Sequence, residues 1–332
     1  MEATVVKHTG SHYLLSALPE WNLFPAVLRG KIRLKGSTAT NPVAVGDRVS
    51  YEFTPNMSAS GSYGRAGESG LPSAGSDVPT EQNPAVITAV LPRRNYVIRR
   101  STNLSRQAHI IAANVDRAFI VVTIDFPEVK LPFLDRLLVT CEVYNVPVTI
   151  VINKCDLYGE EYRDRLDAFH SIYEGAGYPV LEVSAETGLG VDVLCGYCRD
   201  SVSLFSGVSG VGKSSLIKAL DPSLDPKVGE ISDAHLQGRH TTTFYEMYRL
   251  ASGGFIIDTP GIRGFGLVDL EREEIASYFP EMLRASENCR FTPCTHTHEP
   301  GCAVKAAVED GTISYERYSS YLGMLEDETK YR

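Results

Sequence analysis

The sequence has no apolar run near the ~18 residues that a membrane-spanning helix needs. Its first residues also lack the basic start and apolar core of a secretory signal. Its 7 cysteines are an odd number and unevenly spread, and in a reducing compartment clustered cysteines favour metal binding over disulfides. We therefore expect a cytoplasmic protein, acting as a monomer, with no membrane partner.

The sequence also lacks an excess of basic residues, since its net charge is −9. This charge argues against a protein that coats nucleic acid without specificity. The charge is uneven, however. Residues 1–106 contain 12 Lys and Arg against 7 Asp and Glu, and the other 226 residues contain 20 against 34. This asymmetry indicates a localised polyanion contact in the N-terminal part. Four residues that alternate along one expected strand are candidates to meet RNA phosphates: Arg29, Lys31, Arg33 and Lys35.

The pattern along the chain predicts a multidomain protein with three units. Residues 1–106 contain short strands, including 85–100, around a mobile Gly/Ser-rich loop at 55–84, which is typical of a small β-barrel such as an OB-fold. Residues 107–270 alternate buried strands with helices, which indicates an α/β domain with a parallel sheet. Residues 271–332 are expected to form a small helical unit around a Cys/His cluster.

The segment 207–214 reads GVSGVGKS and matches the phosphate-binding loop pattern, between a short apolar strand and a helix. Glycine lets the backbone N–H groups and the helix N-terminus face an anion. Lys213 should reach the β- and γ-phosphates, and Ser214 should ligate Mg²⁺. The expected nucleotide contacts of this loop are Gly207, Val208, Ser209, Gly210, Val211, Gly212, Lys213, Ser214 and Ser215.

A base-reading motif, NKCD, follows another expected strand. The carboxylate of Asp156 can accept hydrogen bonds from the ring N–H and the exocyclic amine of guanine, whereas adenine would leave it unpaired. Asn153 should support the neighbouring loop, and Lys154 should lie along the base. Ser184 and Ala185, at the end of the next strand, should close over the guanine oxygen. These five residues complete the predicted contacts to the base of GTP.

The sequence DTPG begins at Asp258, which is also the last residue of an expected buried strand. The carboxylate of Asp258 can hold Mg²⁺ through water. The N–H of Gly261 can sense the γ-phosphate of GTP. Within GRHTTT, Thr242 is expected to cover Mg²⁺, and Thr243 is the alternative. The predicted magnesium set is therefore Ser214, Thr242 and Asp258.

The motifs stand in an unusual order, because the base reader precedes the phosphate loop. This order predicts a circularly permuted GTPase domain, which is feasible because the termini of a compact domain usually lie at its surface. Ile262 stands where many GTPases carry a water-orienting Gln. His240 is therefore the candidate catalytic residue, either as a base or only as a residue that positions water.

The last motif is a Cys/His cluster with the spacing C-x₄-C-x-H-x₅-C. Three thiolates and one imidazole suit a four-coordinate structural zinc site. The predicted ligands are Cys289, Cys294, His296 and Cys302, and His298 is the alternative to His296.

Together these motifs resemble one family, the circularly permuted GTPases called RsgA or YjeQ, which depend on the small ribosomal subunit. The resemblance covers nearly the whole chain and rests on PVAVGDRV, IAANVD, INKCD, SAETG, GVSGVGKSSL, GRHTTT, DTPGIRGFGL and CRFTPCTHTHEPGCAV. It implies an N-terminal OB-fold, a central P-loop GTPase domain and a C-terminal zinc domain. It also assigns zinc to the four residues given above and a catalytic role to His240.

The resemblance further implies a GTPase that is stimulated by the small subunit, contacts its rRNA and assists its late maturation. Hydrolysis of GTP to GDP and phosphate would drive release from the subunit. The alternative is a nucleotide-gated RNA-binding placeholder on the small subunit, in which hydrolysis is incidental and GTP only shifts the shape of the protein.

Overall fold

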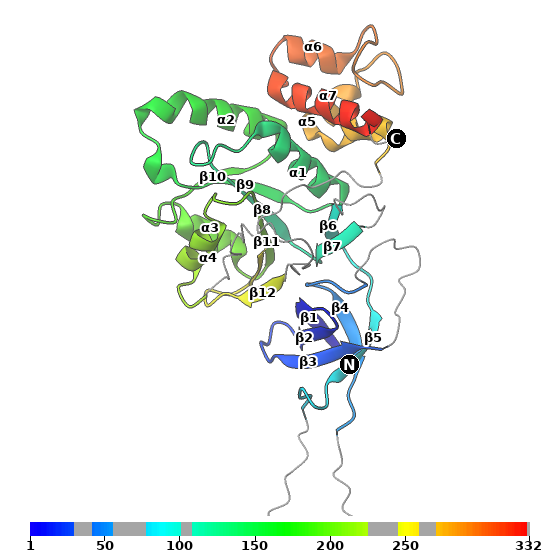
Figure 1. Ribbon diagram of the computed structural model, residues 1–332. Coiled ribbons are helices and arrows are strands. Elements are labelled where there is room, and N and C mark those ends of the chain that lie inside the picture. The colour runs from blue at the N-terminus through cyan, green and yellow to red at the C-terminus, as the bar shows by residue number, and fades with distance from the viewer. Residues whose placement is uncertain (30–41, 56–77, 101–107, 225–244, 259–269, 331–332) are drawn as a thin grey trace, which may run out of the picture.

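The computed structural model describes residues 1–29, 42–55, 78–100, 108–224, 245–258 and 270–330. Figure 1 shows a small barrel at one end, an α/β domain in the middle and a group of helices at the other end. This arrangement agrees with the predicted fold class.

The N-terminal barrel has five strands: β1 (Glu2–Thr9), β2 (His12–Ser16), β3 (Phe24–Leu28), β4 (Arg48–Glu52) and β5 (Ala85–Val90). The strand order is β1-β2-β3-β5-β4, and β4 pairs with β1 to close it. Alternate residues such as Val5, Leu15 and Ile87 point inward and form the barrel core. The predicted barrel is therefore confirmed. Of the four basic residues expected to meet RNA, Arg29 is described, and it is exposed beside Glu52. The described residues do not include Lys31, Arg33, Lys35 or most of the 55–84 loop.

The segment 85–100 divides between two sheets, because only its first strand, β5, pairs within the barrel. Strand β6 (Tyr96–Arg100) pairs instead with β7 (Ala108–Ala113) in a separate two-stranded sheet. The barrel approaches β7 at Gly46, where φ is +88° and a Cβ atom would lie 2.0 Å from the carbonyl oxygen of Ala113. Only glycine fits this close approach. The predicted domain limits at 106/107 and 270/271 stay predictions.

The central sheet has five parallel strands in the order β10 (Val180–Glu182), β9 (Val148–Ile152), β8 (Arg117–Val122), β11 (Val202–Ser206) and β13 (Phe255–Asp258). Continuous apolar runs in β8 and β9 are buried because helices cover both faces of the sheet. Helices α1 (Leu131–Val143) and α2 (Arg163–Ala176) lie on the side of the C-terminal helices (Figure 1). Helices α3 (Val191–Cys198) and α4 (Lys213–Leu220) pack together on the other side.

A short strand that the sequence did not predict, β12 (Glu246–Arg249), joins the barrel to the central sheet. It runs antiparallel to β13 and also pairs with β1, where Lys7 opposes Glu246. The Lys7 Nζ and Glu246 Oε1 atoms form an ion pair at 2.8 Å. One continuous sheet of eleven strands therefore runs through both domains.

The C-terminal unit contains a 3₁₀ segment and three α-helices: η3 (Arg272–Tyr278), α5 (Pro280–Ser286), α6 (Ala303–Glu309) and α7 (Tyr315–Lys330). Phe279, Met282 and Tyr321 form its core, and Val139 of α1 packs against the same cluster. The fully buried Arg317 of α7 forms ion pairs of 2.8 Å with Asp135 of α1 and with Glu281 of α5. The unit is thus anchored to the α/β domain by α1.

Candidate guanine-nucleotide site and metal cluster

The predicted nucleotide motifs meet at one edge of the central sheet. Strands β8, β9, β10, β11 and β13 are parallel, so their carboxyl ends lie at the same edge. The motifs that begin at Asn153, Ser184 and Gly207 each follow one of these strand ends, and Asp258 is the last residue of β13. Ligands of open α/β sheets bind in the crevice at this edge.

The phosphate loop has the backbone that its glycines predict. Gly207, Gly210 and Gly212 have φ values of +152°, +88° and +89°. A Cβ atom on Gly207 would lie 2.3 Å from the carbonyl oxygen of Val121, and one on Gly212 would lie 2.4 Å from Asn153 Nδ2. The loop therefore packs directly against β8 and the base-reading motif, and larger residues would force it apart.

Lys213, at the start of α4, has its ammonium group within the loop. Its Nζ donates to the carbonyl oxygens of Gly207 at 2.8 Å and Val208 at 2.9 Å. Burial lowers the pKa of Lys213, and the neighbouring Asp258 carboxylate opposes this shift. A cation held beside backbone N–H groups at a helix N-terminus suits the binding of an anionic phosphate chain.

Asn153 and Lys154 connect the base-reading motif to the phosphate loop. Asn153 is buried; its Nδ2 donates to Val211 O at 2.8 Å, and its Oδ1 accepts from the N–H of Ala185 at 3.2 Å. Lys154 has a left-handed φ of +65°, and its Nζ donates to Gly210 O at 2.8 Å. The predicted supporting role of Asn153 thus has a geometric basis.

Asp156 is exposed, and the hydroxyl of buried Ser184 donates to its Oδ1 at 2.5 Å. The same Ser184 oxygen accepts from the N–H of Thr187 at 3.1 Å. These bonds fix the direction of one carboxylate oxygen. The structure therefore brings Asn153, Lys154, Asp156, Ser184 and Ala185 together with the phosphate loop, and their roles toward GTP stay predictions.

Two of the predicted magnesium residues are in the described part of the chain. Asp258 is buried at the end of β13, and Ser214 lies in the first turn of α4. Thr242, its alternative Thr243, the candidate catalytic His240 and Gly261 lie outside the described residues.

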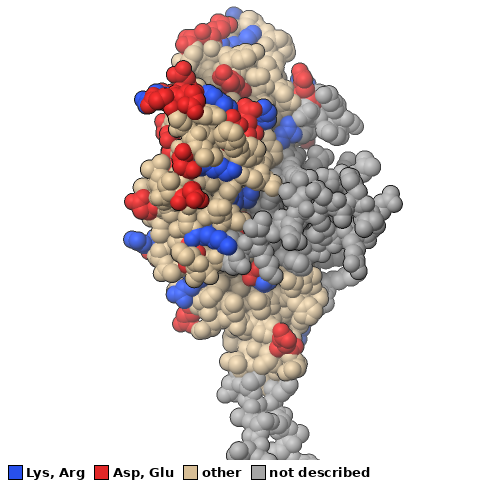
Figure 2. Space-filling view, turned by 60° about the vertical axis from the view of Figure 1, so that its left-hand side comes forward, with Lys and Arg blue, Asp and Glu red and all other residues tan. Residues whose placement is uncertain are grey.

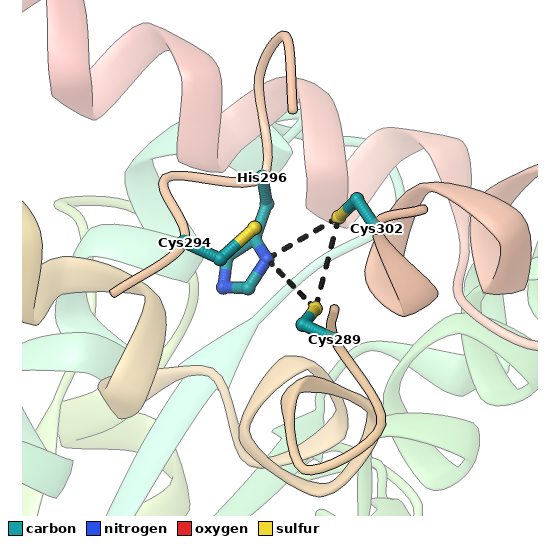
Figure 3. Close-up of side chains that lie close together, drawn as sticks. All are labelled: Cys289, Cys294, His296 and Cys302. Atoms are coloured by element: carbon teal, nitrogen blue, oxygen red, sulfur yellow. Dashed lines mark hydrogen bonds between the residues drawn. The ribbon is translucent and has the colours of Figure 1, made fainter. Parts of the chain in front are cut away.

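The Cys/His cluster is assembled in the C-terminal unit, as Figure 3 shows. One ligand atom from each of Cys289, Cys294, His296 and Cys302 lies within 4.8 Å of the others. The Nδ1 atom of His296 lies 3.7 Å from the Cys289 sulfur and 3.4 Å from that of Cys302. His298 is exposed and its Nδ1 contacts Thr297 Oγ1, so the cluster contains His296 and not the alternative.

The loop that carries His296 is held by neighbouring polar groups. Glu299 accepts hydrogen bonds from the Thr295 hydroxyl at 2.6 Å and from the backbone N–H of Thr295 at 2.7 Å and of Thr297 at 3.1 Å. These bonds lower the pKa of Glu299, whereas its burial acts in the opposite direction. The Tyr318 hydroxyl donates to His296 O at 2.7 Å, and that of Tyr321 to Thr295 O at 2.6 Å. Two tyrosines of α7 thus hold the loop that places His296 in the cluster, as expected for the surroundings of a structural metal site.

Some residues near the site were not found from the sequence. Tyr158 follows the base-reading motif, and its hydroxyl contacts the backbone of two loops. The carbonyl oxygen of Phe126 accepts from Lys154 Nζ. Both interactions use backbone atoms of the loop 124–127, whose sequence, IDFP, matches no motif. No helix in the described part of the chain is long and apolar enough to span a bilayer.

Comparisons with a family model and with known proteins point to the same family. The model of the family described as RsgA GTPase matches residues 90–268. A relative from Bacteroides fragilis, named small ribosomal subunit biogenesis GTPase RsgA, is 46% identical over 334 residues, which cover 100% of this chain and 99% of the relative.

Two solved structures share the fold over almost the full length. The crystal structure of YjeQ from Thermotoga maritima has a TM-score of 0.73 and 32% identity, and the match covers 98% of this chain and 97% of the other. The structure of YloQ, described as a circularly permuted GTPase, has a TM-score of 0.69 and 26% identity, with 100% and 96% covered.

Proposed function

Because this chain belongs to the RsgA GTPase family, we propose that it binds the small ribosomal subunit, assists its late maturation and leaves after hydrolysing GTP. The main support is that the motifs expected to bind the base, the phosphates and Mg²⁺ lie at one edge of the central sheet. They do so although their order along the sequence is permuted. The full-length relatives named for biogenesis of the small subunit support the choice of partner.

We assign the site residues by the contacts that their positions allow. Asp156 reads guanine, Asn153 and Lys154 hold the base-reading motif against the phosphate loop, and Ser184 orients Asp156. Lys213 neutralises the phosphates. Mg²⁺ is bound with GTP by Ser214, Thr242 and, through water, Asp258.

Subunit binding is tested by co-sedimentation with purified ribosomal subunits. With a non-hydrolysable GTP analogue, the protein should pellet with small subunits, and with GDP it should remain in the supernatant. Large subunits serve as the control. Equal pelleting with both subunits would contradict the proposed partner.

The rRNA contact is expected on a basic surface. Among the described residues visible in Figure 2, Lys and Arg are interspersed with Asp and Glu, and no continuous basic patch is present. The described part of that face therefore gives no support for an RNA contact. The excess of Lys and Arg in the sequence of residues 1–106 makes the N-terminal part the expected contact. The monomeric state and cytoplasmic location stay predictions.

His240 distinguishes the GTPase mechanism from the placeholder alternative. The variant His240→Ala should lose about 100-fold of the subunit-stimulated turnover, because general acid–base groups typically contribute 10²–10⁴-fold. Its affinity for GTP should be unchanged. The measurement is stimulated phosphate release, together with the time that the variant stays on small subunits. Normal release by a variant unable to hydrolyse GTP would favour the placeholder.

We propose that the Cys/His cluster holds one structural zinc ion. Its three thiols and one imidazole match the zinc donor set, and four protein ligands leave no open position for chemistry. Burial also lowers the pKa of His296, with Glu299 opposing the shift, which favours the neutral imidazole that binds metal.

The purified protein should contain one zinc per chain by elemental analysis. Cys302→Ala should lose the metal, and removal of zinc from the wild type by a chelator should lower its melting temperature, because ion binding contributes directly to folding. His298→Ala is the matched control and should retain the metal. Loss of zinc from His298→Ala but not from His296→Ala would contradict the ligand assignment.

A further inference from the structure

Tyr158 lies two residues beyond Asp156, and its hydroxyl connects two loops at the sheet edge. The oxygen accepts from the backbone N–H of Ile124 at 3.0 Å and of Asp125 at 3.4 Å. The carbonyl oxygens of Asp125 and Asn153 each lie 3.3 Å away as acceptors for its proton. A hydroxyl can donate once and accept twice, so this position uses its full capacity.

The local backbone explains how Tyr158 reaches this position. Residues Cys155–Leu157 form a 3₁₀ turn in which the N–H of Leu157 donates to Lys154 O at 2.9 Å. This turn reverses the chain and returns the side chain of Tyr158 to the start of the motif, beside Asn153. Burial raises the pKa of the Tyr158 hydroxyl, so the proton that it donates is present at neutral pH.

The second loop, residues 124–127, also contacts the base-reading motif through Lys154. The ammonium group of Lys154 donates to the carbonyl oxygens of Phe126 in this loop and Gly210 in the phosphate loop. Both Phe126 and Lys154 have left-handed φ values, +60° and +65°. Non-glycine residues keep a left-handed backbone only where surrounding contacts hold it in place. The Tyr158 hydroxyl supplies such contacts to both the 124–127 loop and the base-reading motif.

We propose that Tyr158 is a positioning residue for guanine recognition, acting through the backbone of Asn153 and the 124–127 loop to fix the carboxylate of Asp156. This inference rests on the proposed guanine site. Asp156 must present both oxygens to the ring N–H and the exocyclic amine at once. Loosening the motif should therefore weaken the contact to guanine more than the contact to hypoxanthine, which lacks the amine.

The test compares the affinities of GDP and IDP for the wild type, Tyr158→Phe and Tyr162→Phe. Tyr158→Phe removes only the hydroxyl and should weaken GDP binding about fivefold to tenfold, which corresponds to one lost hydrogen bond of about 1–1.5 kcal/mol. IDP binding should weaken less, so that the GDP/IDP affinity ratio falls at least threefold. Tyr162→Phe is the control, because among the described residues its hydroxyl bonds a side chain, that of Asp125, at 3.1 Å, and not the backbone of the base-reading motif. Its ring packs on that of Tyr158.

The outcomes are distinct. An equal loss for GDP and IDP would show that Tyr158 supports the fold without setting base recognition, and would overturn the inference, as would unchanged affinities. An equal fall of the ratio in Tyr162→Phe would also overturn it. If the wild type bound GDP no better than ADP, the guanine site itself would be wrong, and this inference would fall with it.

Discussion

Replacing Asp156 by asparagine should change the preferred base from guanine to xanthine. In the proposed site the carboxylate accepts two hydrogen bonds from guanine, and an asparagine would place its NH₂ group against the guanine amine, donor against donor. Xanthine has a carbonyl in place of that amine and can accept from the new NH₂ group. We expect Asp156→Asn to bind GDP about 1,000-fold more weakly, because sites built for specific hydrogen bonds discriminate strongly.

The measurement is competition of GDP and XDP for a fluorescent nucleotide. The Ser184 hydroxyl, which donates to Asp156 Oδ1, can still donate to an asparagine oxygen, so the motif should keep its place. Asp167→Asn, on the exposed surface of α2, is the control and should leave both affinities unchanged. Tight GDP binding by Asp156→Asn would refute the assignment of Asp156 as the base reader.

Replacing Arg317 by methionine should produce the largest loss of stability. Arg317 is fully buried with Asp135 and Glu281, and its guanidinium lies 4.5 Å from the ring centre of Phe279. Methionine retains most of the volume but leaves two buried carboxylates without a counter-charge. Breaking a buried ion pair in this way costs about 3–5 kcal/mol. Burial already raises the pKa of Asp135 despite Arg317, so its carboxylate depends on this partner.

The free energy of unfolding in urea measures the effect. Arg163→Met is the control, because Arg163 pairs with Glu160 at the surface, where such pairs contribute about 0–1 kcal/mol. A similar small loss in both variants would show that the buried cluster does not anchor the C-terminal unit. The ion pair between Arg317 and Asp135 attaches the C-terminal unit directly to α1 of the α/β domain.

The motifs were predictable because each depends on chemistry at the end of one strand. Gly207 and Gly212 are required by the close approach of Val121 and Asn153, and Asp156 was predicted from the hydrogen-bond donors of guanine. Parallel strands then bring these positions to one edge whatever the chain order. The same local logic predicted the Cys/His cluster but not the choice between His296 and His298, since spacing alone permits both.

The features that were missed depend on pairing between distant segments. Strand β12 is only four residues long and is defined by its partners β1 and β13. Strand β6 has the apolar residues of a strand, as the barrel strands do, and only its pairing with β7 shows that it belongs to a separate sheet. Arg317 stands in a polar stretch of α7, and nothing local indicates that Asp135, 182 residues away, neutralises it.

GTP turnover by the purified protein, measured alone and with small subunits, large subunits or free RNA, tests the central claim most directly. Turnover should be slow alone and should rise strongly with small subunits only, because subunit binding completes the geometry around the attacking water. Equal rates in every mixture would contradict this account and would reduce the permuted site to a binding switch.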